Sequence, residues 1–164
     1  MYGWYAWKRN WTWQRRRSKT KLGQEGENVK EILVVGGGAA GIAAALSAAE
    51  AGGRVTILEG LNRPGKKLLV TGNGRCNLGN TRIAPECYHT ARPDRLKVLL
   101  KQMPATLTTD FFERWGLMTM ADEAGRLYPY CRQASMVVDV LLLALQRRGV
   151  AVETDCTVAE AFWD

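Results

Sequence analysis

Apolar residues first gather into a continuous run at Glu31–Val35, in which Ile, Leu and two Val follow one charge. An uninterrupted run of this kind predicts a strand buried in a parallel sheet. Ala39–Ala51 is rich in Ala and predicts a helix, which Gly52 and Gly53 would end. A second apolar run, Arg54–Leu58, follows at once. Strand, helix and strand in this order predict one right-handed βαβ unit.

The pattern after residue 90 alternates between helical and extended segments. Residues 31–164 therefore predict an α/β fold, a Rossmann-like domain with a parallel sheet. The later elements that we expect are helices at Pro93–Met103, from Thr108–Asp110 through Trp115 and at Gln133–Arg148, a hairpin of Leu117–Met120 and Arg126–Tyr128 around the turn Asp122–Gly125, and a strand at Val150–Thr154 parallel to the first.

Most of the net charge of +7 lies at the N-terminus. Residues 1–30 hold eight of the 23 Lys and Arg and two of the 16 Asp and Glu, a net of +6, which leaves +1 for residues 31–164. Basicity confined to one end says little about what the rest of the chain binds. We therefore expect no nucleic-acid partner for residues 31–164.

Residues 1–30 form a basic, Trp-rich extension that we expect to be disordered. Four Trp alternate with Lys and Arg there, a composition that could stack on bases or lie at a membrane surface. It could equally be a disordered tail or an upstream start that normal translation does not use, and a non-functional or accessory tail is the interpretation that we favour. The polar stretch from Gly23 to Asn28 predicts a linker.

Neither a metal site nor a membrane segment is expected. The four Cys lie at positions 76, 87, 131 and 156 without a Cys-x-x-Cys pair, and His89 is the single histidine. This favours reduced thiols in a cytoplasmic protein. Ile32–Gly53 carries few charges but is built from Ala and Gly, which insert weakly into membranes. We expect His89 to lie at the surface and Cys76 to be a packed, inert thiol.

The first candidate site is Gly36-x-Gly38-x-x-Gly41, which follows one predicted strand and opens a helix. In such a loop the first glycine allows the turn, the second lets the backbone approach a pyrophosphate, and the third lets helix and strand pack closely. Glu59 ends the second strand, where its carboxylate can accept hydrogen bonds from a ribose diol and would repel a 2′-phosphate. The pattern predicts a dinucleotide other than NADP and leaves FAD and NAD open.

A second glycine loop follows, Thr71-Gly-Asn-Gly-Arg-Cys-Asn77, after the sequence Gly65-Lys-Lys67. Its glycines permit backbone conformations closed to other residues, and Asn73 tolerates left-handed geometry. Arg75 supplies a planar cation. The composition suits the polar edge of a cofactor or a diphosphate, and it is equally typical of a surface turn.

The order of these motifs resembles a family. The Gly-rich helix start, the acid that ends the second strand, GKKLLVTGNGRCNLGN and then GRLYP before a long helix are similar to the bacterial FAD-dependent flavoproteins called aminoacetone oxidase-like or NAD(P)/FAD-dependent oxidoreductases, a group with members linked to bile-acid reduction. The resemblance covers about Val29 to Val158 and implies FAD in extended form. It puts the pyrophosphate on the first loop, the adenosine ribose on Glu59, the flavin side along the second loop, and adenine at the backbone of Val158.

The resemblance implies these FAD-binding positions: Gly36, Gly38, Ala39, Ala40, Gly41, Glu59, Lys67, Gly74, Arg75, Cys76, Asn77 and Val158. It implies an oxidoreductase in which NAD(P)H or a small-molecule substrate passes a hydride to the flavin, and it names no catalytic side chain. Tyr128 and Tyr130, which flank Pro129, are expected to fill core.

Two departures from the family pattern stand out. Thr71, Asn73 and Gly79 replace the usual Ser, Gly and Thr around the second loop. Family members are also about twice as long or more, so the chain is expected to be an N-terminal portion, incomplete relative to the family. The alternative to an oxidoreductase is a truncated nucleotide-binding module without turnover.

Overall fold

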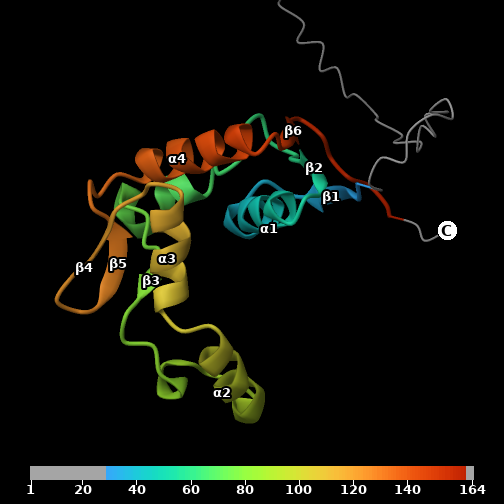
Figure 1. Cartoon of the computed structure of the whole chain (residues 1–164). Coiled ribbons are helices and arrows are strands. Elements are labelled where there is room, and N and C mark those ends of the chain that lie inside the picture. Colours follow the sequence, from blue (N-terminus) through green and yellow to red (C-terminus); the bar gives the residue numbers. More distant parts are fainter. Residues whose placement is uncertain (1–28, 162–164) are drawn as a thin grey trace, which may run out of the picture. The chain divides into compact units, whose positions relative to one another are not determined.

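The computed structural model describes residues 29–161, and Figure 1 shows their arrangement. The predicted extension at residues 1–30 lies outside the described residues except for its last two. The elements, with η for 3₁₀-helices, are β1 (Glu31–Val35), α1 (Ala39–Glu50), β2 (Arg54–Leu58), η1 (Leu68–Gly74), β3 (Gly79–Asn80), η2 (Pro85–Cys87), α2 (Pro93–Gln102), α3 (Thr106–Arg114), β4 (Thr119–Ala121), β5 (Arg126–Pro129), α4 (Ala134–Arg147) and β6 (Ala151–Glu153).

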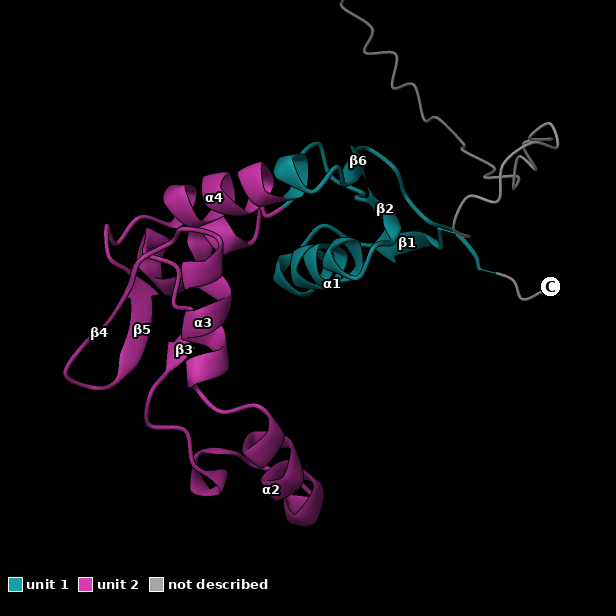
Figure 2. Cartoon of the chain, viewed as in Figure 1, with its two compact units in different colours: residues 1–64, 145–164 teal, residues 65–144 magenta. Residues whose placement is uncertain are grey.

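The chain divides into two compact units (Figure 2). Unit 1 comprises Met1–Pro64 and Leu145–Asp164, and unit 2 comprises the intervening Gly65–Ala144. Residues 31–164, which the sequence predicts to be one domain, contain both units. The first glycine loop belongs to unit 1 and the second belongs to unit 2.

Unit 1 contains a parallel sheet of order β1-β2-β6. β1 pairs with β2 and β2 pairs with β6, in both cases parallel. α1 connects β1 to β2 and packs against these strands (Figure 1), and its Ile42 and Leu46 are fully buried together with Ile57 of β2. The predicted βαβ unit and α/β fold are therefore confirmed. β6 is parallel to the first strand, as expected, but its hydrogen-bonded neighbour is β2.

The prediction that β1 is buried on both faces was wrong for the described chain. Its residues alternate between half-buried and exposed, with Leu33 41% and Val35 66% exposed. Ile32 and Val34 lie on the half-buried face. The reason is that α1 and the turn after it pack against the face that carries Ile32 and Val34, whereas Leu33 and Val35 lie on the opposite face.

Unit 2 contains a small antiparallel sheet of order β3-β5-β4. β4 and β5 form the predicted hairpin, and β3 joins the other side of β5. Val137 and Val138 of α4 and Leu127 of β5 are at most 4% exposed and belong to its core. Tyr128 is 5% exposed, as predicted, but Tyr130 is 65% exposed because it lies beyond the end of β5. The prediction that Tyr130 fills core was wrong.

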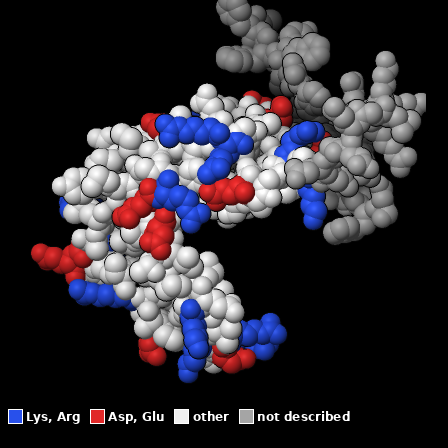
Figure 3. All heavy atoms as spheres, viewed as in Figure 1, with Lys and Arg blue, Asp and Glu red and all other residues white. Residues whose placement is uncertain are grey.

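The helix boundaries agree with the sequence except at α3. This helix begins at Thr106, two residues before the predicted capping segment, because Leu107 N–H donates to Pro104 O and Thr108 N–H to Ala105 O. The turn after Pro104 thus starts the helix. No helix in residues 29–161 combines the length and apolarity that a membrane crossing requires. On the face drawn in Figure 3, the Lys and Arg of the described chain lie among Asp and Glu.

Candidate functional site

The three glycines of the first loop each occupy a position with a specific steric demand. Gly36 has φ +94°, a left-handed conformation that favours glycine, and its N–H donates to Leu58 O at 2.8 Å. A Cβ on Gly41 would overlap Gly36 O and lie 3.4 Å from Val34 Cγ1. Around Gly38, by contrast, an added Cβ would meet nothing within 4 Å. The loop therefore needs Gly36 and Gly41 for its own geometry and leaves open space at Gly38.

The start of α1 faces this open space with unsatisfied donors. Gly38 is the N-cap, and within the described chain no side chain caps the helix and no acidic residue lies in its first turn. Ala39 and Ala40 are exposed. The first N–H groups of a helix lack intrahelical acceptors, and the helix dipole favours an anion there. The loop thus has both the room and the donors that a pyrophosphate requires.

Each carboxylate oxygen of Glu59 accepts a hydrogen bond from a backbone N–H group. Its Oε2 accepts from Gly37 N–H at 2.6 Å, and its Oε1 accepts from Leu61 N–H at 2.8 Å. Because a carboxylate oxygen has two lone pairs, each oxygen can accept one further hydrogen bond. The carboxylate is therefore fixed in an orientation from which it can also accept from a ribose diol.

Gly37 belongs to this site although it occupies a variable position of the motif and was not predicted as a binding residue. It is buried, and a Cβ on it would lie 2.7 Å from Pro64 Cβ and 3.1 Å from Glu59 Oε2. A side chain here would push Glu59 out of its position. The signal in the sequence was the third consecutive glycine in Gly36–Gly38.

The segment that leads to Val158 lies beside Glu59. Glu59 N–H donates to Glu153 O at 2.8 Å, and Cys156 N–H donates back to Glu59 O at 2.9 Å. Asp155 N–H donates to Leu61 O at 3.0 Å, and Val158, two residues after Cys156, is half-buried. The structure thus brings the predicted ribose and adenine positions to the same end of the parallel sheet.

The second loop, in unit 2, has an unusual backbone. Gly72 has φ +56°, Gly74 +76°, and the non-glycine residues Asn73 and Cys76 have φ +54° and +58°. A Cβ on Gly72 would lie 2.8 Å from Asn77 N. Four left-handed residues in a stretch of five require glycine or tolerant side chains, which explains the composition of the loop.

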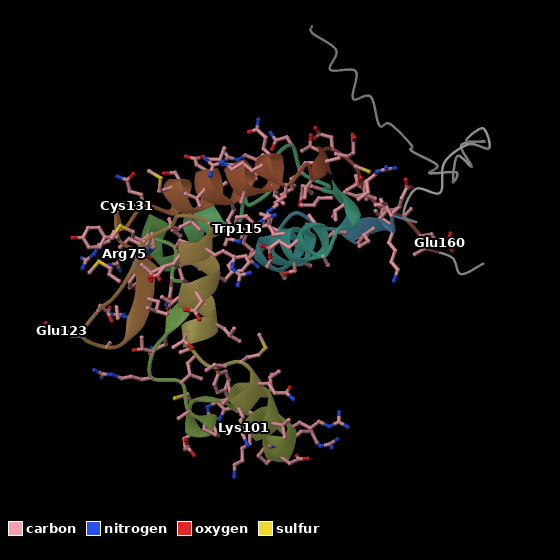
Figure 4. All side chains as sticks on the ribbon, viewed as in Figure 1. Arg75, Lys101, Trp115, Glu123, Cys131 and Glu160 are labelled. Carbon is pink, nitrogen blue, oxygen red and sulfur yellow. The ribbon has the colours of Figure 1, made fainter. Side chains whose placement is uncertain are left out.

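The polar side chains of this loop have different environments. Arg75 Nε–H donates to Gly72 O at 3.2 Å, and its guanidinium carbon lies 4.9 Å from the ring centre of Tyr128 (Figure 4 marks Arg75). Asn77 is exposed, and its Oδ1 accepts from Gly79 N–H at 3.0 Å. Lys67 and Gly74 are exposed. The loop therefore offers a cation whose orientation is defined beside an accessible backbone.

Cys76 is 1% exposed, and burial raises the pKa of its thiol, an effect that a hydrogen bond with the Thr71 side chain opposes. A buried neutral thiol is a poor nucleophile, in agreement with the prediction of an inert side chain. His89 is exposed, as predicted. Within residues 29–161 no three His, Cys, Asp or Glu side chains come together as a metal site would require, and all four cysteines are free.

Comparisons with known proteins give the family and its curated relatives. The model described as "HI0933-like protein Rossmann domain" matches residues 30–163. The chain is 41% identical over 132 residues to a 3-dehydro-bile acid delta(4,6)-reductase of Clostridium scindens, covering 79% of this chain and 32% of the relative. It is 30% identical over 121 residues to a ribosomal RNA dihydrouridine synthase of Escherichia coli, covering 73% of this chain and 30% of the relative. The chain thus spans about a third of the length of either relative.

Among solved structures, THI4 of Thermovibrio ammonificans superposes with a TM-score of 0.51 at 15% sequence identity, covering 77% of this chain and 38% of that one. An identity this low supports the fold alone, which agrees with the parallel sheet of unit 1. The family model, in contrast, extends over both glycine loops and the GRLYP motif. The chain belongs to the HI0933-like Rossmann-domain family, a family of FAD-binding oxidoreductases.

Proposed function

We propose that this chain is the FAD-binding portion of a flavoprotein oxidoreductase. The observation that carries the proposal is the first loop, where open space at Gly38 lies beside the uncapped start of α1 and where Glu59 is fixed by two N–H groups. This combination suits a dinucleotide with an unmodified ribose. Membership of an FAD-binding family favours FAD over NAD.

Each residue that the family resemblance implies has a role in this proposal. The backbone of Gly36, Gly38, Ala39, Ala40 and Gly41 would bind the pyrophosphate at the positive end of α1. The carboxylate of Glu59 would accept hydrogen bonds from the adenosine ribose, and the backbone of Val158 would meet adenine.

The second loop would hold the ribityl and flavin side of the cofactor. Arg75 offers a cation of defined orientation, Lys67 adds a second positive charge, and Gly74, Cys76 and Asn77 supply backbone that a ligand can approach. Bound flavin supplies hydride-transfer chemistry, so that the protein contributes position and electrostatics. We assign no catalytic side chain.

A reduced nicotinamide, NADH or NADPH, is the electron donor that we propose, and a small molecule is the substrate class. The higher identity to a bile acid reductase than to a ribosomal RNA dihydrouridine synthase favours a small-molecule substrate over RNA. The narrower resemblance to aminoacetone oxidase-like proteins, and the cytoplasm as the location, stay predictions.

The second candidate, which the sequence leaves open, is a nucleotide-binding module without turnover. Purified chain is titrated with FAD, FMN and NAD, and binding is followed by the visible absorbance and the fluorescence of the flavin. Tight binding of FAD with weaker binding of FMN, which lacks the adenylate, is expected. If FAD does not bind, the proposal fails. If FAD binds and neither NADH nor NADPH reduces it, the module without turnover is the better description.

A further inference from the structure

The GRLYP motif, Gly125–Pro129, is part of the pattern that resembles the family, and the proposed function assigns it no role. Its last three residues are buried and form β5 with Arg126. β5 lies directly beside the segment after the second glycine loop, since Leu78 N–H donates to Leu127 O at 2.8 Å and Gly79 pairs with Leu127. The motif therefore pairs with the backbone that directly follows the second loop, and we call it the support of that loop.

Tyr128 is the residue of this support that contacts the loop. Its ring faces the Arg75 guanidinium, with 4.9 Å between the guanidinium carbon and the ring centre. A Cβ added to Gly72 would lie 3.3 Å from Tyr128 Cε1, so the ring also packs against the Gly72 backbone. Arg75 Nε–H donates to Gly72 O, which closes a cluster of three residues.

The loop needs such a contact for two physical reasons. Non-glycine residues with left-handed φ, here Asn73 and Cys76, are strained and persist only where the surroundings hold them. A free arginine side chain also loses rotamer entropy when a ligand fixes it. The Tyr128 ring next to Arg75 reduces both the backbone strain and the entropy loss. It packs against the loop backbone, and it restricts the guanidinium before any ligand binds.

Among the described residues, Arg75 forms one side-chain hydrogen bond, from Nε. The geometry assigns Tyr128 as a positioning residue, which holds Arg75 and the Gly72 backbone in the conformation that receives the polar edge of the cofactor. This inference rests on the proposed function, because the cofactor is the ligand that Arg75 would meet. Tyr128 itself would act through Arg75 and need not touch the cofactor.

A double-mutant cycle on the full chain tests this role. The variants are Tyr128→Leu, Tyr128→Phe, Arg75→Ala and the double variant Tyr128→Leu/Arg75→Ala, and the readout is the dissociation constant of FAD. A cation–π contact of about 0.5–1.5 kcal/mol corresponds to roughly 2- to 12-fold in affinity. We expect Tyr128→Leu to weaken FAD binding by that factor, Tyr128→Phe to change it less than about twofold, and Tyr128→Leu to have no further effect once Arg75 is Ala.

A purely structural role for Tyr128 predicts a different pattern. Val137→Ala serves as the matched control, because Val137 is fully buried in unit 2 and truncating its side chain destabilises the core of that unit. It should lower the urea midpoint and leave the FAD dissociation constant unchanged. If Tyr128→Leu weakens binding equally with Arg75 and with Ala at position 75, or if Val137→Ala weakens binding as much, the positioning role is refuted.

An NMR measurement without cofactor separates this inference from the proposed function. The Arg75 Hε resonance, assigned by its loss in Arg75→Lys, should be shifted upfield by the ring current of Tyr128 and should exchange slowly, because Nε–H is hydrogen-bonded. The shift should persist in Tyr128→Phe and disappear in Tyr128→Leu. An Arg75 Hε resonance at the position of a solvated arginine in the unmodified chain overturns the inference even if FAD binds. Failure of FAD to bind, with the resonance shifted, would instead refute the proposed function.

Discussion

Gly38→Ala and Gly41→Ala should impair different properties of the chain, although both residues belong to the same motif. At Gly41 the added Cβ overlaps Gly36 O, whereas at Gly38 it meets nothing within 4 Å. We therefore expect Gly41→Ala to impair folding and Gly38→Ala to impair cofactor binding in a chain that still folds. The pair separates the glycine that the fold requires from the glycine that the ligand requires.

The cost of Gly41→Ala follows from the backbone contact. Gly36 O belongs to the chain itself and cannot rotate away, so either the loop or the start of α1 must move. Overpacking of this kind costs about 1–3 kcal/mol, and we expect the upper end because the obstacle is backbone. For a chain of this size about 3 kcal/mol lowers Tm by roughly 6–12 °C.

Gly38→Ala should change stability by less than about 1 kcal/mol. The backbone of Gly38, with φ −77° and ψ −175°, is extended and open to any residue. Alanine lowers the entropy of the unfolded chain, a gain of about 0.4–1 kcal/mol, and it is a poorer N-cap than glycine by a similar amount. A bound pyrophosphate would meet the new Cβ, and a clash of about 1–3 kcal/mol corresponds to roughly 5- to 150-fold weaker FAD binding.

Both variants are compared with the unmodified chain by urea unfolding, followed by far-UV circular dichroism, and by titration with FAD. The expected result is a lowered urea midpoint for Gly41→Ala, and an unchanged midpoint with weak FAD binding for Gly38→Ala. Normal FAD affinity in Gly38→Ala would refute the view that the open space at Gly38 receives the pyrophosphate. An unchanged midpoint in Gly41→Ala would refute the steric argument.

Three further predictions concern single residues. Glu59→Gln replaces one accepting oxygen by a donor, which leaves one of the N–H groups around it, such as that of Gly37, without an acceptor, and it should weaken FAD binding roughly tenfold or more by titration. Cys76, buried and with a raised pKa, should be alkylated far more slowly than the exposed Cys131 at pH values near the ordinary thiol pKa, as measured by mass spectrometry; equal rates would contradict its placement. Asn73→Val should lower the free energy of unfolding by about 1–3 kcal/mol because a β-branched residue resists φ +54°, while Asn73→Gly should not lower it, and urea titration of both decides the point.

Local patterns predicted unit 1 well. An apolar run, a Gly-rich turn and an Ala-rich helix are each specified by residues within a few positions of one another, and the βαβ unit combines them in the one handedness that sheets allow. The roles of Gly36 and Gly41 were predictable for the same reason, since their steric demands arise between adjacent elements. The burial of β1 was not predictable, because it depends on which other segments lie beside that strand.

The second loop marks the limit of such reasoning. Its composition indicated tolerance of unusual backbone conformations, and the structure has left-handed φ at Asn73 and Cys76. The composition did not indicate that Tyr128, which lies in another motif of the sequence, supports Arg75. Pairing of β3 with β5 creates that contact, and a sequence without an alignment carries no record of which distant strands pair.

The sequence by itself determined the βαβ unit, the two glycine loops and the acid at the end of β2, because short-range sterics and hydrophobic periodicity specify them. Only the tertiary structure decided that Glu59 accepts from the N–H of Gly37, that β6 lies beside β2, and that Tyr128 lies under Arg75. Each of these depends on segments far apart in the chain meeting at one place, and packing of the whole fold, rather than any local preference, selects which segments meet.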